Sequence, residues 1–516
     1  DNNSSTNHHH DELKNDITVL ESFYPKLLPR MCLNRFYLAQ GVKLYSHDTW
    51  KMLFGNSNPN HQSKRRNGKQ TVARFAGPIS RYYLKMCDAD NHVVREAACQ
   101  AVAELANRIG RDSNTHHTDQ HTDQHPEQEL TCGELLAPYV PMLLQGLIMC
   151  FHDESWPVRD EACLACGTFC LAYPAECEPE LPTLIPRWTE QLTDQIWSVR
   201  EDAAIALGDA LLAYGQPLYE HILLTLQTQL KSAIDQPPLS KEEYKRLQND
   251  IDAHSENQLY SCGSLAPKLR KSGAGRIGCG NCQINRPKAL WEATDGCIYL
   301  LKELCTRILL STHHPSTHNN NNNNNNMLLQ MQTTLNDETL LPLMTDLAQV
   351  CAVKHFPQAN SLRTTLWKQL PFMAQAIGKK RFKQKFLHLY IELLANNLER
   401  RHMDDDSRMS VYAAERCTVE LANLVGRNIL RGRFDEMGYG DIFDDAMNVM
   451  IENEERDTLM HGHHDGLGPA GMEAFASPFG PPDSIITRNS GPTHSTSTTK
   501  PSFSAPTPGA GFIETL

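Results

Sequence analysis

The stretch "SWPVRDEAC" at residues 155–163 returns as "IWSVREDAA" at residues 196–204. Both stretches carry a tryptophan, then Val-Arg, then acidic residues and alanine. A third copy, "NHVVREAAC", surrounds Arg95, so that Arg95, Arg159 and Arg200 occupy equivalent positions. A phrase written several times indicates either a catalytic motif used more than once or a structural unit that has been copied.

A more divergent fourth copy, "SRMSVYAAERC", has Val411 at the position of the arginine. Its far end identifies it, because "ELANRIGR" at 104–111 returns as "ELANLVGR" at 420–427. The two strings keep the same distance from Arg95 and Val411. We therefore expect the repeated unit to recur near the C-terminal end of the ordered chain.

Apolar and small residues follow the arginine position at helical intervals. The third residue after it is Ala98, Ala162, Ala203 or Ala414, and residues with apolar side chains recur seven, ten and fourteen positions after it. Steps of three, four and seven mark one face of an α-helix. The eighth position holds small or slim residues, including Gly167 and Gly208, which allow a neighbouring helix to approach closely.

A second helix is predicted before each arginine. In the second copy Leu143, Leu147 and Phe151 lie sixteen, twelve and eight residues before Arg159, again on one helical face. Short polar turns separate the two helices, and their Asp and Ser residues are typical helix caps. Each unit is thus predicted to be an antiparallel helix pair of about 40 residues, the period of a helical solenoid.

The Asp, Val-Arg and Ala at the start of the second helix resemble the HEAT repeat of the armadillo-type superfamily. The resemblance implies an all-α fold, a right-handed α–α superhelix in which each unit contacts its neighbours. It is carried by residues 79–214 and extends with weaker matches to about residue 430. We expect about six helix pairs in all.

The chain is expected to divide into these segments: a disordered N-terminus at 1–15, an N-terminal helical cap at 16–55, the solenoid at 75–430, an acidic segment with helical character at 431–460, and a disordered tail at 465–516. Within the solenoid we expect low-complexity insertions at 111–130 and 311–326. A further insertion, at 234–288, is rich in Cys, Gly and basic residues. Polar low-complexity tracts bury too little apolar surface to fold.

Composition restricts the class of protein. The 516 residues carry a net charge of −12, which disfavours nucleic acid as a partner. The 16 cysteines lie mostly in apolar, helix-like stretches, which indicates a reducing compartment, cytoplasmic or nuclear. We expect no membrane span, because no run approaches the roughly 18 to 20 apolar residues that a membrane helix needs. The chain begins with Asp1, as a fragment or a processed chain would.

The repeated arginines have two interpretations. In one, Arg95, Arg159 and Arg200 form a ladder of contacts to an anion or a partner. In the other, each pairs with acidic groups of the adjacent turn and holds successive units in register. Repetition in every unit favours the second interpretation, since a solenoid needs the same interface each time. Ala98, Ala162 and Ala203 are then packing residues of the same repeat.

The insertion at 234–288 contains the only expected metal site. Cys279 and Cys282 form a CxxC pair, Cys262 is a third donor, and His254 or Cys297 would be the fourth. Two thiolates on a tight turn suit tetrahedral zinc. The irregular spacing of the other donors argues against zinc, so a loop of unliganded, reduced cysteines remains the alternative. A redox CxxC is disfavoured because no βαβ pattern surrounds it.

Two further segments carry charge. "GKKRFKQKF" at 378–386 is either a nuclear-import signal or acidic-ligand patch, or, as we favour, the charged face of an amphipathic helix. The acidic stretch at 434–457 contains Phe443, Met447, Val449 and Ile451, and is either a capping helix or a helix that docks on a partner.

The sequence therefore predicts a non-enzymatic helical-repeat scaffold or adaptor that binds protein partners and carries no cofactor, with structural zinc the one exception left open. The alternatives are a HEAT-like enzyme, bilin-lyase-like or metal-dependent, and a solenoid associated with nucleic acid. Deoxyhypusine hydroxylase, which resembles this architecture, binds iron through His-Glu dipeptides, and the sequence contains none. No Gly-rich phosphate loop or nucleophile–base set is recognisable.

Overall fold

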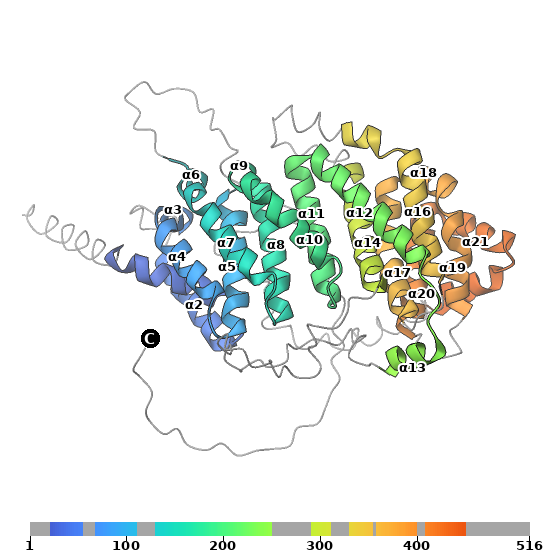
Figure 1. The fold of residues 1–516 in the computed structure, drawn as a ribbon, viewed down its shortest axis with the longest axis horizontal. Coiled ribbons are helices and arrows are strands. Elements are labelled where there is room, and N and C mark those ends of the chain that lie inside the picture. Colours follow the sequence, from blue (N-terminus) through green and yellow to red (C-terminus); the bar gives the residue numbers. More distant parts are fainter. Residues whose placement is uncertain are drawn as a thin grey trace, which may run out of the picture.

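A computed structural model describes residues 21–54, 68–110, 130–249, 290–310, 330–353, 358–399 and 408–449. Within these ranges the regular elements are all helices. The helices stand side by side along the long axis of the molecule (Figure 1). The prediction of an all-α solenoid is confirmed.

The described residues contain six helix pairs, each made of a first and a second helix. The first helices are α4 (Ala76–Cys87), α7 (Val140–Cys150), α10 (Leu181–Gln191), α12 (Gln216–Ile234), α16 (Asp337–Ala352) and α19 (His388–Leu398). The second helices are α5 (His92–Ile109), α8 (Trp156–Ala172), α11 (Trp197–Tyr214), α14 (Leu290–Cys305), α17 (Ala359–Ile377) and α20 (Arg408–Val425). We call each pair a unit and number the units 1 to 6.

The second helices form one continuous layer. Each packs against the next, in the order α5, α8, α11, α14, α17 and α20, although long segments of chain separate some of them. The first helices form the other layer, in which α4 contacts α7, and α12, α16 and α19 contact one another in turn. This two-layer stack of helix pairs is the architecture of an α-helical solenoid.

Burial follows the helical faces that the sequence predicted. Ala98, Ala162, Ala203 and Ala414 are fully buried in their second helices. The predicted faces of the first helices are also buried. In unit 2 this holds for Leu143 and Leu147 of α7 and for Phe151, which directly follows α7. The periodicity argument therefore located both the helices and their inward faces.

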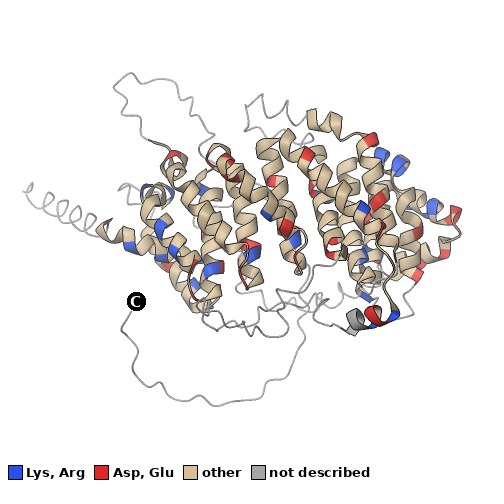
Figure 2. Cartoon of the chain, in the orientation of Figure 1, with Lys and Arg blue, Asp and Glu red and all other residues tan. Residues whose placement is uncertain are grey.

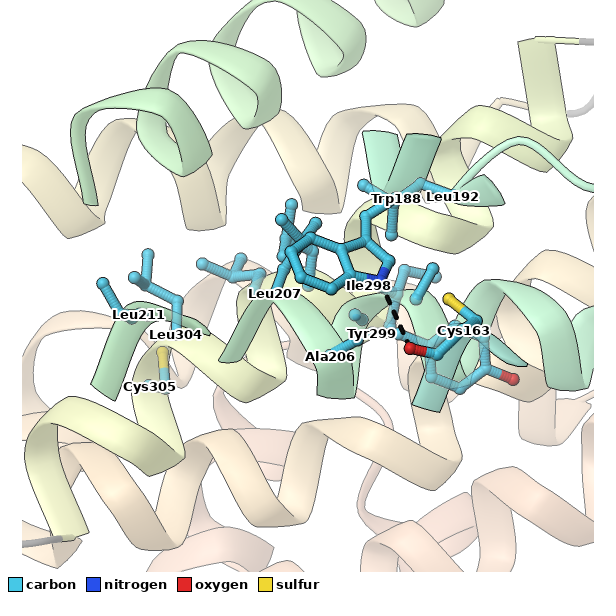
Figure 3. Close-up of a cluster of buried hydrophobic side chains, with 14 of the residues drawn as sticks. Cys163, Trp188, Leu192, Ala206, Leu207, Leu211, Ile298, Tyr299, Leu304 and Cys305 are labelled. Carbon is cyan, nitrogen blue, oxygen red and sulfur yellow. Dashed lines mark hydrogen bonds between the residues drawn. The ribbon is translucent and has the colours of Figure 1, made fainter. Parts of the chain in front are cut away.

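The core between units 2, 3 and 4 shows how the layers interlock (Figure 3). Trp188 of α10 lies between residues of the second helices, among them Ala206 and Ile298, and is fully buried. Its indole Nε1 donates a hydrogen bond of 3.2 Å to the carbonyl oxygen of Cys163 in α8. A buried tryptophan needs such a partner for its N–H group.

Small residues let the second helices approach closely. At Gly167 a Cβ atom would lie 2.6 Å from the Cα atom of Ala206, so any larger residue would collide with the backbone of α11. Gly208 is less crowded, with Glu303 Oε2 3.2 Å from the equivalent position. The eighth position after the arginine thus has a packing role, most stringent in unit 2.

Other helices extend and connect the solenoid. Residues 21–34 form a helix before α2 (Gln40–Phe54) and α3 (Gly68–Arg74). Short elements α6 (Cys132–Leu136), η2 (Ala137–Tyr139), α9 (Pro174–Cys177) and η3 (Glu178–Glu180) lead into first helices, and the π-helical turn η5 (Thr306–Leu310) continues α14. The remaining helices are α13 (Lys241–Asn249), residues 330–334, α18 (Lys379–Lys385), α21 (Arg427–Glu436) and residues 440–449.

Two predicted bounds can be compared with the helices, and a third expectation needs correction. The division between solenoid and acidic segment at 430/431 falls inside α21, whose Phe434 ring lies tilted against Phe443 of the next helix with ring centroids 5.4 Å apart. The insertion at 234–288 includes helix α13. The residues Cys132–Cys150 do reach the length and hydropathy of a membrane span, with 39% of that stretch buried. In the fold they form α6, η2 and α7, and α7 packs against α4 and α8.

Candidate functional site: the turns and outer face of the second helices

The repeat arginines join consecutive units through buried ion pairs. Arg95 of unit 1 reaches Asp153 in the turn of unit 2, with Nε–Oδ2 and Nη2–Oδ1 distances of 2.6 and 2.7 Å. Arg159 of unit 2 binds Asp194 in the turn of unit 3 in the same two-pronged way, at 3.0 Å for both contacts. Such paired contacts fix the relative orientation of the two groups.

The third repeat arginine pairs with an acidic residue at a different position in the repeat. Arg200 pairs with Asp295, which lies within helix α14 rather than in a turn, at 2.8 Å from Nε and 2.7 Å from Nη2. Both side chains are almost completely buried, with 3% and 1% exposed. The Arg200 guanidinium also lies 5.2 Å from the ring centroid of Trp291, a cation–π contact. We call these three pairs the arginine ladder.

Each rung also organises the turns. Asp153 Oδ1 accepts a hydrogen bond of 2.9 Å from the backbone N–H of Ser155, and Asp194 Oδ1 accepts one of the same length from Ile196. The arginines donate from Nη1 to carbonyl oxygens of their own turns, as Arg159 does to Asp153 at 2.9 Å. The turn aspartates therefore shape the loop and bind the preceding unit simultaneously.

The capping expected of these turns is only partly as predicted. Asn91 caps α5 by accepting a hydrogen bond from the backbone N–H of Val93. Ser155 precedes α8 but makes no side-chain cap. The turn aspartates, which precede the cap position, accept the backbone hydrogen bonds instead, and their carboxylates also bind the arginine of the previous unit.

The arginine ladder begins at Arg95 and is not continued in unit 5. Unit 1 has Ala89 at the position of Asp153 and Asp194, and no repeat arginine precedes it. In unit 5 Arg363 donates to the carbonyl oxygens of Cys351 and Val353, at 2.9 and 3.1 Å, within its own unit. The arginines are thus buried in contacts between and within units, the geometry of packing groups rather than of an exposed ligand site.

A different set of positions on the second helices faces outward. The fifth residue after the arginine position is partly exposed in units 1 to 3, as is the twelfth. These outward positions are Gln100, Leu164 and Ile205 at the fifth residue, and Asn107, Leu171 and Leu212 at the twelfth. With Trp197 they form what we call the outer stripe; Trp197 is 43% exposed and Leu171 is 36% exposed.

Carboxylates border the outer stripe. Glu96, Glu161 and Glu201 follow their arginines by one or two residues and are partly exposed. Glu161 accepts a hydrogen bond of 2.8 Å from Gln100, which links units 1 and 2 across the stripe. Burial, together with the charge of Glu161, raises the pKa of Glu96 from 4.5 to about 7. The border is therefore a place where additional positive charge is favourable.

The outer stripe is not among the features predicted from the sequence. The predicted helical face consists of the positions three, seven and ten residues after the arginine, which the structure buries. The signal was present, because Leu164 and Ile205 share one outward position and Leu171 and Leu212 share the next. Apolar residues repeated on the outward face of a repeat are unusual for a purely packing function.

The predicted metal site lies outside the described residues. Cys262, Cys279, Cys282 and the alternative donor His254 all fall within 250–289. The other alternative donor, Cys297, lies buried in α14, where its Sγ is 3.2 Å from Gln229 Oε1. The zinc hypothesis for this loop stays a prediction.

The two charged segments have structural partners. In α18, Phe382 is fully buried and Phe386 after it is also buried, while Lys379 and Lys380 are exposed. Arg381 pairs with Asp337 of α16 at 2.6 Å. This is the amphipathic helix that the sequence favoured. The described part of the acidic segment packs Phe443 and Met447 inward, as a capping helix does.

Acidic and basic residues are interspersed along the described helices (Figure 2). Many of them belong to pairs that join neighbouring helices, including the ladder and Arg307 with Asp209 at 2.9 Å. A surface of mixed sign offers little to a polyanion.

No protein-family model matches the chain, and no curated protein matches it. Two solved structures are similar to it: importin beta in an ammonium sulfate condition, with 14% identity and a TM-score of 0.25, and the complex of Kap95 with Nup1, with 12% identity and a TM-score of 0.28. Each match covers 83% of this chain, which spans about half of the other, 51% and 50% respectively. At this similarity the matches transfer no function.

Proposed function

We propose that this HEAT-repeat solenoid is a non-enzymatic scaffold or adaptor that binds a protein partner along the outer stripe of its second helices. The observation that carries the proposal is the recurrence of partly exposed apolar residues at equivalent outward positions of consecutive units, Leu164 with Ile205 and Leu171 with Leu212. An apolar surface bordered by polar groups is the usual composition of a protein interface.

The chemistry of the stripe specifies the partner further. Trp197 and Leu171 provide apolar contact area, and Glu96, Glu161 and Glu201 provide negative charge along the same helices. A partner segment with an apolar face and flanking Lys or Arg residues complements both features. We therefore propose an amphipathic, basic peptide or helix as the bound element.

Two observations support the remaining parts of the proposal. The buried charged groups Arg95 and Arg200 join neighbouring units, which fits a structural rather than a catalytic use. None of the 13 cysteines that the structure describes forms a disulfide, and all but one are buried, which supports a reducing compartment, cytoplasmic or nuclear.

The test is site-specific photocrosslinking in the source cells. A photoreactive phenylalanine analogue at Leu171 should form adducts with a partner, and the same analogue at Leu224 should not. Leu224 is a matched control because it is more exposed, at 64%, but lies on first helix α12. Equal adducts at both positions, or adducts at Leu224 alone, would rule out the outer stripe as the binding surface.

Substitution then tests the chemistry of the surface. Leu171→Arg combined with Ile205→Arg should abolish co-purification of the crosslinked partner, because both apolar area and charge complementarity are lost. Leu224→Arg should leave it intact. If the crosslinked segment proves acidic, the proposed basic partner is wrong even though the surface is right.

A further inference from the structure

Three buried thiols from different helices of units 1 and 2 converge at one place. They belong to Cys87 at the end of α4, Cys99 in α5 and Cys150 at the end of α7, and their Sγ atoms all lie within 4.8 Å of one another. All three side chains are buried, with 3%, 0% and 2% exposed. Among the described residues this is the group whose donor atoms are arranged to hold a metal ion.

The spacing of the sulfur atoms fits a shared ion. Sulfur ligands at the usual zinc–sulfur distance of about 2.3 Å lie roughly 3.8 Å apart when they surround one ion. Sulfur atoms that already lie within 4.8 Å of each other need only small side-chain movements to reach that geometry. Three helices supply one donor each, so an ion here would join α4, α5 and α7.

The local chemistry also favours a cation. The Cys150 thiol donates a hydrogen bond of 3.5 Å to the backbone carbonyl oxygen of Cys87, so the ends of α4 and α7 are in direct contact at the cluster. Without a cation, gathering negative charge on three buried sulfurs is costly. A bound cation removes that cost and displaces the remaining thiol protons.

We propose that Cys87, Cys99 and Cys150 form a binding site for one thiophilic cation, Zn²⁺ or Cu⁺, that clamps the first two units of the solenoid together. Thiolate ligands select these two ions. Zinc takes four ligands in structural sites. A fourth ligand would come from outside the three-thiol cluster, and Cys166 of α8, which is fully buried in unit 2, is the residue to test.

The site is separate from the CxxC loop, and the experiment must keep the two apart. The full chain carrying Cys279→Ser and Cys282→Ser serves as the background, so that this loop cannot contribute thiolates. The reduced protein is titrated anaerobically with Co²⁺, as an optical substitute for zinc, and separately with Cu⁺. We expect one equivalent to bind with a sulfur-to-metal charge-transfer absorption.

A matched pair of substitutions identifies the ligands. Cys99→Ala should weaken binding by more than about 100-fold, a loss larger than the roughly 10- to 100-fold cost of removing a group that only supports a ligand. Alanine is tolerated at this helix position, because the equivalent residue of unit 3 is Ala204. Cys163→Ala is the control: Cys163 is the equivalent residue of unit 2, is equally buried, and lies outside the three-thiol cluster. It should leave binding unchanged.

Two further measurements distinguish zinc from copper and test the site without depending on the folding of a cluster variant. If Cys166→Ala abolishes Co²⁺ binding, the site is four-coordinate and takes zinc; if it has no effect and Cu⁺ is held more tightly, the site is three-coordinate. X-ray absorption on the loaded background chain should show a shell of sulfur alone, without relying on any variant at the cluster. Uptake of neither ion, equal binding by Cys99→Ala and Cys163→Ala, or a shell containing nitrogen or oxygen would overturn the proposal.

Discussion

Units 1 to 3 and units 5 and 6 stack their helices in the same way but differ in what holds neighbouring units in register. In the first region, the arginine ladder crosses each junction, as Arg95 does to Asp153. In the second, Arg363 binds carbonyl oxygens of its own unit and Val411 replaces the arginine altogether. Helices α17 and α20 nevertheless pack closely, with fully buried residues such as Leu366 and Leu421.

The comparison separates two roles that the repeat combines. Stacking depends on the buried small and apolar face, which both regions share. The ladder adds orientation, because a two-pronged arginine–carboxylate contact is satisfied in one geometry only. Replacing a whole buried ion pair by apolar residues changes the free energy of unfolding little, whereas removing only one of the two charges is strongly destabilising. The two regions should therefore respond very differently to substitution at the arginine position.

The largest expected effect is at the most buried rung. Arg200→Ala leaves the Asp295 carboxylate, 1% exposed, without its guanidinium partner. Removing one member of such a pair costs about 3–5 kcal/mol. Urea unfolding monitored by circular dichroism should show this as a lower midpoint. The double variant Arg200→Met, Asp295→Leu should recover most of the loss, since neither charge then remains buried.

That double variant is the sharper test of the comparison. If it stays as unstable as Arg200→Ala, apolar stacking cannot replace the ladder in the first region as it does in the second. The distinction between stacking and orientation would then be wrong.

An intermediate effect is expected from helix approach. Gly167→Ala places a Cβ atom against the backbone of α11, where Ala206 Cα would be 2.6 Å away, and should destabilise by about 1–3 kcal/mol through overpacking. Gly432→Ala is the control in α21, because no atom lies within 4 Å of its Cβ position. Helix propensity should make that change stabilising by up to about 1 kcal/mol. Thermal midpoints that move in the same direction would contradict the burial of the eighth position.

A smaller effect depends on pH and is specific to the first region. Because the folded-state pKa of Glu96 is raised from 4.5 to about 7, the folded chain holds this proton more tightly than the unfolded chain. The favourable contribution is complete below about pH 4.5 and is lost as the pH rises through 7. Glu96→Gln should therefore be more stable than the parent at pH 8, by on the order of 1 kcal/mol, and about equally stable at pH 4.

The control for this prediction is Glu420→Gln in α20, whose carboxylate is 42% exposed. Its unfolding midpoint should follow the parent at both pH values. A parallel gain at pH 8 in both variants would point to the overall negative charge of the chain rather than to the surroundings of Glu96.

The sequence predicted the structural features that are encoded within one unit, and it did not predict contacts between distant segments. Periodicity located both helices of a unit and the burial of Ala98, Ala162 and Ala203, because a helical face is encoded locally. The acidic partners of Arg95 and Arg159 lie in the adjacent turn, as the packing interpretation required. Asp295, the partner of Arg200, lies 95 residues away within a helix, and no spacing rule identified it.

The candidate sites show the same limit more strongly. The cysteine cluster draws Cys87, Cys99 and Cys150 from three helices, so no motif such as CxxC marks it. The sequence instead directed attention to Cys279 and Cys282, which share a turn. Recognition of the cluster required the register between α4, α5 and α7, which only the folded arrangement supplies.

The smallest effect is expected at the C-terminal end, where ion pairs are exposed. Arg431 pairs with Asp435 and Asp444, each at 2.8 Å, but these side chains are 43%, 44% and 38% exposed. Water and salt screen such contacts, and ordering the long side chain offsets part of the attraction. Arg431→Ala should therefore leave the urea midpoint nearly unchanged at physiological salt, in contrast to Arg200→Ala. A loss comparable to that of Arg200→Ala would mean that burial is not what separates the two regions, and that the helix at 440–449 is held by this pair rather than by Phe434 and Phe443.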